Sequence, residues 1–148
     1  CQAVVAMWAK IGLKPKLNSM NFAPYIAKIQ NFDTSVYMLG WGVATYDALY
    51  SLQSLVRTKT TGADGNFNLR RINDTRLDAI IDQLKTEPDV TKRNALIRRA
   101  LERTKEESYY VTLHHQIRPW AMKKEVTTLH RSDDRPEARF AKVSGGGS

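Results

Sequence analysis

Ser35-Val36-Tyr37-Met38-Leu39-Gly40-Trp41-Gly42-Val43-Ala44-Thr45-Tyr46-Asp47 is the stretch of this 148-residue chain from which the fold is predicted. It begins with β-branched and aromatic residues, which indicate a buried strand over residues 35–39. Two glycines then flank a tryptophan, and a segment with helical spacing follows. Open α/β sheets commonly bind ligands where a strand ends in a loop before a helix. We therefore predict a substrate-binding loop formed by Gly40, Trp41, Gly42, Val43, Ala44, Thr45, Tyr46 and Asp47.

Trp41 has two interpretations within this loop. It is either a core residue at a tight turn or an aromatic platform for a ligand, because the glycines leave the face of its ring open. The functional prediction rests on the second interpretation.

The rest of the chain alternates helical and extended patterns. Apolar residues with helical spacing predict helices over residues 2–11, 21–29, 49–56, 74–84 and 89–101. Residues suited to helix ends support these helices, with Gly12 after the first and Asn21, Asp74 and Asp89 as N-caps. Strands are predicted over residues 13–17, 35–39 and 109–115, and a last extended stretch over 120–127.

The order helix, strand, helix, strand with short connections is the pattern of a βαβ unit with parallel strands. Pro88 separates the last two helices, which we therefore expect to form an antiparallel pair. The predicted fold class is α/β, with a small mixed sheet flanked by helices. The folded domain is predicted to span residues 1–128, followed by a polar C-terminal tail over 129–143. The composition of residues 144–148 is typical of a flexible linker or of a cloning scar.

Composition narrows the class of protein. The hydrophobic fraction of 42% and the charged fraction of 26% are ordinary for a soluble globular domain. No apolar run approaches the ~20 residues of a membrane helix, and no signal peptide is recognisable. The single cysteine, Cys1, rules out an internal disulfide. Cys1 is either the lipid-bearing residue of a bacterial lipoprotein or, as we prefer, part of a helix that begins earlier in a longer protein.

The net charge of +8 raises the alternative of a basic nucleic-acid-binding domain. The basic residues are scattered among acidic ones and form no stripe with aromatics, so solvated helix faces are the preferred interpretation. We therefore predict no nucleic acid among the partners.

No catalytic or metal chemistry is predicted. His114 and His115 are adjacent, so on a strand they point to opposite faces and do not easily share a metal. The motifs of serine hydrolases, P-loops and dinucleotide-binding folds are absent. A hydrolase fragment that uses one of these histidines is a third hypothesis, for which no nucleophile is found. We predict no catalytic residue, no metal ligand and no cofactor.

Several stretches of the sequence resemble motifs that one known protein family carries. Residues 5–14, which contain Ile11-Gly12, are similar to the family's helix that ends in "L-x-x-I-G-I" before a strand. Residues 21–29 are similar to the helix that follows it in the family, with the pattern "W-x-x-Y-x-x-K". Leu39-Gly40-Trp41-Gly42 resembles a ligand-loop motif, and residues 66–81 resemble "N-x-x-x-Y-x-N-x-x-x-D-x-L-I". The order of these motifs up to about residue 128 is that of the periplasmic solute-binding proteins of ABC transporters, in the oligopeptide and dipeptide class.

The resemblance implies a two-lobed clamshell that closes on a peptide-like solute. This chain would supply part of the C-terminal lobe. Its implied partners are the solute, an ABC transporter permease and the N-terminal lobe of the same protein. The implied function is substrate binding for a bacterial importer, without catalysis, in the periplasm.

The resemblance also implies roles within the loop. The family's loop tryptophan, here Trp41, lies against the ligand, and an aspartate three residues later pairs with the ligand's amino group. This chain has Ala44 at that position, and its nearest carboxylate is Asp47. Either Asp47 reaches the amino group or that group is recognised differently. A third alternative is a ligand that is not a plain α-peptide, since glutathione-like, opine-like and sugar ligands occur in the family.

Overall fold

A computed structural model describes residues 1–43, 45–131, 133 and 135–144. Ala44 therefore lies outside the described residues. The chain divides into two compact units, one from Cys1 to Tyr110 and the other from Val111 onward. The predicted domain boundaries at residues 128 and 143 stay predictions.

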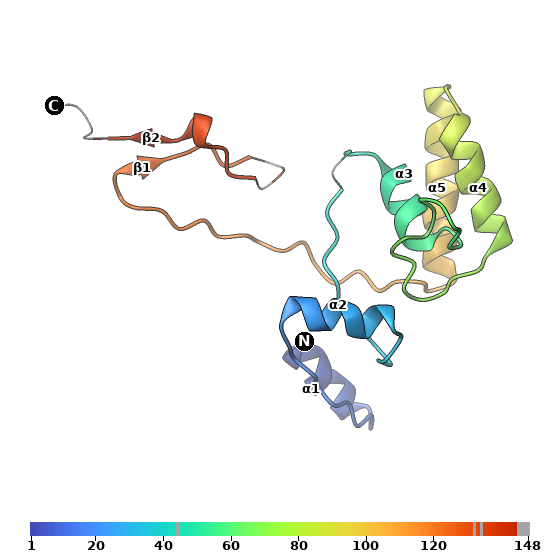
Figure 1. The fold of residues 1–148 in the computed structure, drawn as a ribbon. Coiled ribbons are helices and arrows are strands. Elements are labelled where there is room, and N and C mark those ends of the chain that lie inside the picture. The colour runs from blue at the N-terminus through green and yellow to red at the C-terminus, as the bar shows by residue number, and fades with distance from the viewer. Residues whose placement is uncertain (44, 132, 134, 145–148) are drawn as a thin grey trace. The chain divides into compact units, whose positions relative to one another are not determined.

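The first unit begins with two short helices, α1 (Gln2–Lys10) and α2 (Phe22–Gln30), labelled in Figure 1. Gly12 follows α1 in the left-handed region, with φ of +85°. Its N–H donates to the Ala9 carbonyl, and the Leu13 N–H donates to Trp8. These two bonds form the glycine-dependent motif that ends a helix. The prediction that Gly12 follows the first helix is confirmed, and Asn21 occupies the N-cap position of the second helix, although its side chain makes no capping hydrogen bond.

The helix predicted over residues 49–56 is present, but it changes geometry halfway. Residues Ala48–Ser51 are α-helical (α3), and Leu52–Val56 continue as a π-helix (η1). At its end the Arg57 N–H donates to the carbonyl of Leu52, five residues earlier. Leu52 and Val56 are both 3% exposed, so η1 turns two apolar side chains into the core.

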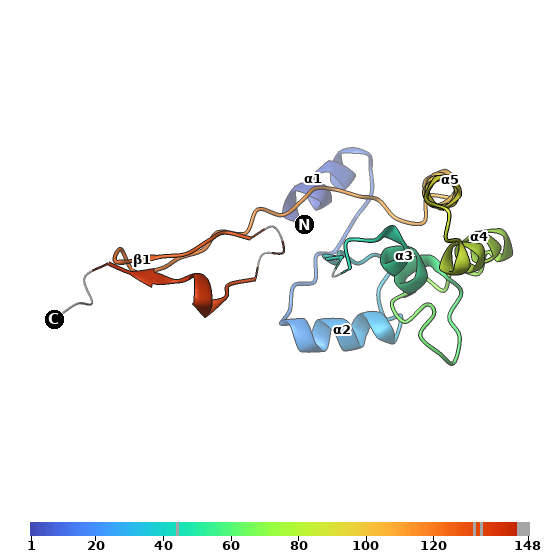
Figure 2. The same cartoon turned by 90° about the horizontal axis from the view of Figure 1, so that it is seen from above.

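Helices α4 (Thr75–Thr86) and α5 (Val90–Glu106) form the predicted antiparallel pair, joined by a three-residue connection. The side chains of Asp74 and Asp89 cap them as predicted. Figures 1 and 2 show α3 beside this pair. The shared core comprises Leu52, Val56, Ile72, Leu77, Ile81, Leu84, Leu96 and Ala100.

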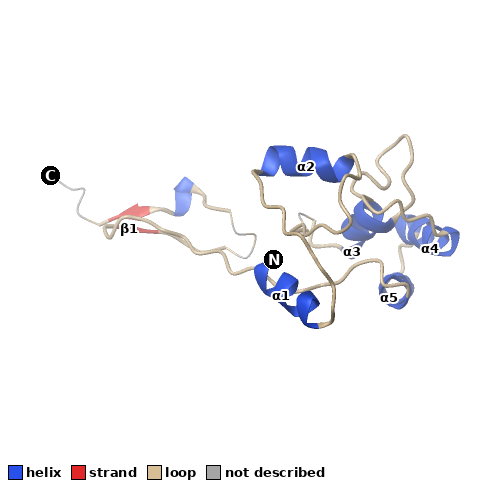
Figure 3. Cartoon of the chain, turned by 90° about the horizontal axis from the view of Figure 1, so that it is seen from below, coloured by secondary structure: helices blue, strands red, loops and turns tan. Residues whose placement is uncertain are grey.

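The second unit carries the described strands, β1 (Val126–Thr127) and β2 (Lys142–Val143). They pair antiparallel, with Val126 opposite Val143, and are the red elements of Figure 3. A short 3₁₀ helix, η2 (Ala138–Phe140), lies just before β2. The rings of Trp120 and His130 meet edge to face, with 4.6 Å between their centroids.

The predicted mixed sheet is wrong in its details. The structure is helix-rich with one small antiparallel sheet, which is compatible with an α/β class. Within the described residues, however, 13–17, 35–39 and 109–115 form no strand, and of 120–127 only the last two residues do. A strand needs a neighbour that bonds its backbone. At Met38 the hydroxyl of Tyr25 takes that place, accepting from the backbone N–H at 2.9 Å and donating to the carbonyl at 2.6 Å.

No helix in the described part of the chain combines the length and the apolar character that crossing a membrane requires.

Candidate functional site

Trp41 lies at the centre of an aromatic cluster, which we define as Trp41, Tyr50 and Phe67. Its ring stacks on Tyr50, with 5.4 Å between centroids and 23° between planes. Phe67 meets it edge to face at 5.3 Å and 65°. Its indole Nε1–H donates to Oγ of Ser51 at 3.0 Å. These contacts fix the ring in one orientation while leaving the residue half-buried.

The elements behind the cluster hold its members in place. Tyr50 and Ser51 belong to α3, whereas Phe67 comes from the loop between η1 and α4. The Phe67 N–H donates to the Ser54 carbonyl at 2.9 Å. Gly65 makes the same kind of bond to Gln53, also at 2.9 Å. The loop is thus hydrogen-bonded to the helical segment on which Tyr50 lies.

Gly65 is required by a close approach of two backbone segments. Its φ is +67°, and an added Cβ would lie 2.6 Å from both the Arg57 carbonyl oxygen and the Cα of Lys59. No other residue type fits this position without a shift of the backbone.

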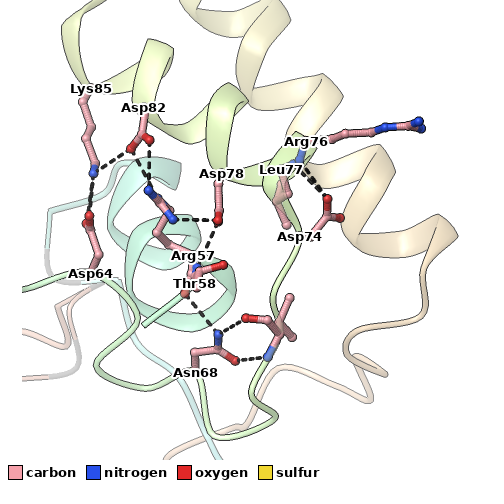
Figure 4. A network of polar contacts seen from close by, with 11 residues as sticks. Arg57, Thr58, Asp64, Asn68, Asp74, Arg76, Leu77, Asp78, Asp82 and Lys85 are labelled. Carbon is pink, nitrogen blue, oxygen red and sulfur yellow. Dashed lines mark hydrogen bonds and ion pairs between the residues drawn. The ribbon is translucent and has the colours of Figure 1, made fainter. Parts of the chain in front are cut away.

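A polar network anchors the same loop to α4 (Figure 4). Arg57 bridges two carboxylates of α4, Asp78 at 2.7 Å and Asp82 at 3.0 Å. Lys85 pairs with Asp64 at 2.9 Å. Burial raises the pKa of Asp64, but hydrogen bonds from Lys85 and Gln53 outweigh burial and hold it below the usual value.

Asn68 adds a buried connection within this network. Its Nδ2 donates to the carbonyls of Arg57 at 3.1 Å and Ile72 at 2.7 Å, and its Oδ1 accepts from the Ile72 N–H at 2.9 Å. The side chain is therefore fully used in shaping the loop that carries Phe67.

The two glycines beside Trp41 differ from Gly65. A Cβ added at Gly40 or at Gly42 would meet no atom of the described residues within 4 Å. Packing against the described residues therefore does not require glycine at either position. Their small size leaves room on both sides of the tryptophan that no described residue fills.

Asp47 is already engaged within the chain. It is the N-cap of α3, and its Oδ1 accepts from the Leu49 N–H at 2.7 Å. Its carboxylate also pairs with Arg93 of α5 at 2.9 Å. Hydrogen bonds from Arg93 and from the Leu49 amide hold the pKa of Asp47 below its usual 3.8. This carboxylate is ionised and neutralised by its own chain.

The remaining described residues of the predicted loop connect Trp41 to α3. The Val43 carbonyl accepts from Tyr46 at 3.4 Å, and Thr45 Oγ1 accepts from the Asp47 N–H at 3.3 Å. Tyr46 has a φ of +55°, and the residue is 71% exposed. A left-handed backbone at a bulky residue costs about 1–2 kcal/mol, so the loop holds this exposed ring at an energetic cost.

The sequence did not single out Tyr50, Ser51, Phe67 or Arg93 as site residues. Phe67 had a local signal, because it lies between two asparagines in a motif of the resemblance. Tyr50 and Ser51 lie in a predicted helix, and nothing in the helical pattern distinguishes them. Arg93 is one of many basic residues on α5 and is identified only by its contact with Asp47.

The histidines supply no metal centre in the described part of the chain. No group of three or more His, Cys, Asp or Glu residues there is placed to hold an ion. His114 and His115 are both exposed in the second unit, and His130 packs against Trp120.

Comparisons of this chain with protein-family models, with curated proteins and with solved structures found no match. The resemblance to periplasmic solute-binding proteins therefore stays a prediction from the sequence.

Proposed function

We propose that this chain is part of the substrate-binding component of a bacterial ABC importer for peptides or peptide-like solutes. In this proposal residues 1–128 contribute part of the C-terminal lobe, an N-terminal lobe closes over the ligand in the periplasm, and a permease receives it. The protein binds and does not catalyse. The observation that carries the proposal is the fixed, half-buried ring of Trp41 beside two glycines that face open space.

The fixed ring supports a binding role in energetic terms. A side chain held by a stack, an edge contact and a hydrogen bond has little rotational freedom left to lose when a ligand arrives. Such preorganisation increases affinity because less entropy is lost on binding. An aromatic face also accepts ligands of varied sequence, which suits a solute whose side chains vary.

The engagement of Asp47 narrows the solute class within this proposal. An unpaired ammonium is costly to bury, and the carboxylate of Asp47 already has Arg93 as its cation. The family's aspartate position is Ala44. We therefore infer that the preferred solute is peptide-like but does not rely on a free α-amino group at this loop.

Two variants test the role of Trp41 in the complete protein that contains this chain. Isothermal titration calorimetry with a defined peptide mixture should show about tenfold weaker binding for Trp41→Ala. The matched control is Trp8→Ala, which removes a half-buried tryptophan of α1 and should leave binding unchanged. A large fall in melting temperature for Trp41→Ala, with unchanged peptide binding, would instead identify Trp41 as a core residue.

The two-lobe requirement and the solute class have separate tests. The isolated chain should bind the peptides far more weakly than the complete protein, and equally tight binding would contradict the clamshell. N-acetylated and free peptides of one sequence should bind the complete protein equally well. A strong preference for the free amine would overturn the inference from Asp47 and Ala44.

Nucleic-acid binding is the alternative function, and the net positive charge is the only observation that favours it. Several cations of the first unit already pair with carboxylates, namely Arg57, Lys85, Arg93 and Arg103. Binding to DNA or RNA would weaken steeply as salt is raised. A salt slope near zero would exclude it.

A further inference from the structure

A cavity of about 460 Å³ lies where the end of α2 meets the loop between η1 and α4. This volume is within the range of small-molecule sites, roughly 300–1,000 Å³. The aromatic cluster contributes no lining residue, although Asn66 and Asn68, on either side of Phe67, both line the cavity. The full lining is Gln30, Phe32, Thr58, Lys59, Gly65, Asn66, Asn68, Leu69, Arg71, Ile72 and Asn73.

The charged side chains that line this cavity are all basic. Lys59 and Arg71 are its only charged residues, and no carboxylate accompanies them. Cations elsewhere in the first unit, such as Arg57 and Lys85, pair with acidic residues at 2.7–3.0 Å. In the described part of the chain neither cation of the cavity has such an ion pair.

Arg71 is held in place without losing its hydrogen-bond donors. Its Cζ lies 3.6 Å from the centroid of the Phe32 ring, which is van der Waals contact. An aromatic ring is a weak acceptor, whereas the guanidinium carries five N–H donors in its own plane. The backbone of Arg71 is left-handed, with φ of +55°. A cation held in this way is prepared to bind an oxyanion with two donors at once.

Thr58 supplies an independent observation in the same lining. Its Oγ1 is buried and has no hydrogen-bond partner in the described structure. The residue itself is fixed, because its backbone N–H donates to Asp78 at 3.0 Å (Figure 4). A buried hydroxyl without a partner costs free energy. An acceptor bound in the cavity would satisfy this hydroxyl after a local shift of the lining, because Oγ1 has almost no accessible surface of its own.

We propose that this cavity binds a small solute through a carboxylate or phosphate group. Arg71 and Lys59 provide the positive charge, and the Thr58 hydroxyl provides a further donor once the lining has shifted to expose it. Asn68 takes no part, since its amide is already used by the backbone of Arg57 and Ile72. The proposal does not depend on Trp41 or on the importer function.

The test uses the full chain and two simple probes, inorganic phosphate and acetate, at constant ionic strength maintained with chloride. Titration followed by amide chemical shifts should show saturable changes at Thr58, Lys59 and Arg71. Saturation by phosphate alone assigns a phosphate site, by acetate alone a carboxylate site, and by both a general oxyanion site. Saturation by neither would overturn the proposal.

Three variants show whether binding occurs in this cavity. Arg71→Asn removes the charge with a residue that tolerates a left-handed backbone, and it should weaken binding about tenfold. Thr58→Val should weaken binding severalfold without loss of stability, because it removes a hydroxyl that has no partner. The control Arg76→Ala removes the same charge from an exposed position of α4 outside the lining, and it should leave binding unchanged.

Equal losses in Arg71→Asn and Arg76→Ala would mean that the chain attracts anions only through its net charge, which would overturn the proposal. Trp41→Ala should leave phosphate and acetate binding intact. Failure of the peptide experiment and failure of the anion experiment are therefore distinguishable.

Discussion

Asp47 and Arg93 join the loop before α3 to α5 through an ion pair of 2.9 Å, across 46 positions of sequence. The same carboxylate accepts the Leu49 N–H as the cap of α3. One side chain thus sets both where the helix begins and how the Trp41 loop meets the helical pair.

These two roles of Asp47 are separable by substitution. Asp47→Ala should cost about 1–2 kcal/mol, because it removes a cap and a half-exposed ion pair. Asp47→Asn keeps a capping oxygen and should cost less than about 1 kcal/mol. Urea unfolding of the two variants measures the difference. Equal losses would show that the cap contributes nothing at this position.

Asp74 predicts a pH dependence of stability. Burial raises the pKa of Asp74, but hydrogen bonds from Arg103, Tyr109 and the Leu77 amide outweigh burial and lower it below 3.8. The unfolded chain therefore takes up the proton first as the pH falls. The stabilisation by this carboxylate is complete above about pH 5 and is lost progressively as the pH falls through the lowered pKa of the folded state.

Asp74→Asn tests this dependence. The variant should lose about 1–3 kcal/mol at neutral pH, and its free energy of unfolding should fall less than that of the wild type on acidification. Urea unfolding at a series of pH values measures both quantities. Parallel pH profiles for the two proteins would contradict the assignment to Asp74.

Substitution by alanine is expected to destabilise the protein at Gly65 and to leave its stability nearly unchanged at Gly42. Gly65→Ala places a Cβ 2.6 Å from backbone atoms at a positive φ, so it should cost more than about 2 kcal/mol. Gly42→Ala meets nothing within 4 Å and should leave the melting temperature nearly unchanged. If the Trp41 loop binds a ligand, Gly42→Ala should nevertheless weaken binding. Loss of stability in Gly42→Ala would indicate a packing role instead.

Asn68→Ala should destabilise the first unit by about 2–4 kcal/mol. The change leaves the buried Ile72 N–H and carbonyl without their side-chain partner. Thermal unfolding followed by circular dichroism measures the loss. The exposed neighbour substitution Asn66→Ala serves as the control, since residue 66 is exposed and should change the melting temperature little.

The helices could be predicted from the sequence because their signals are local. Asp74 and Asp89 cap within three residues of their own positions, and Gly12 ends α1 by bonds to the preceding turn. Apolar spacing then identified the face that packs. None of this required knowledge of a distant segment.

The sheet could not be predicted in the same way, because strands form by pairing. Residues 35–39 have strand composition, yet the backbone of Met38 is bonded by a tyrosine hydroxyl from α2. Conversely, Lys142–Val143 gave no strand signal and pairs with Val126–Thr127. Amino-acid composition indicates which segments are compatible with a strand, whereas a strand forms only where a partner segment is available to pair with it.

The candidate site was predictable only in part for a similar reason. The glycines beside Trp41 indicated a loop with free space, and the described residues leave that space unfilled. The contact between Trp41 and Phe67 joins residues 26 positions apart, and Asp47 meets Arg93 across a longer separation still. Such contacts depend on how the helices pack, which local patterns do not specify.

The division of the chain after Tyr110 has a calorimetric consequence. In the described residues, the buried apolar side chains all lie between Ile29 and Ala100, inside the first unit. The heat-capacity increase on unfolding comes mainly from newly hydrated apolar surface. The heat-capacity step measured across the melting transition of this protein would therefore report on the helical unit almost alone, and unravelling of the β1–β2 pair would add little to that step.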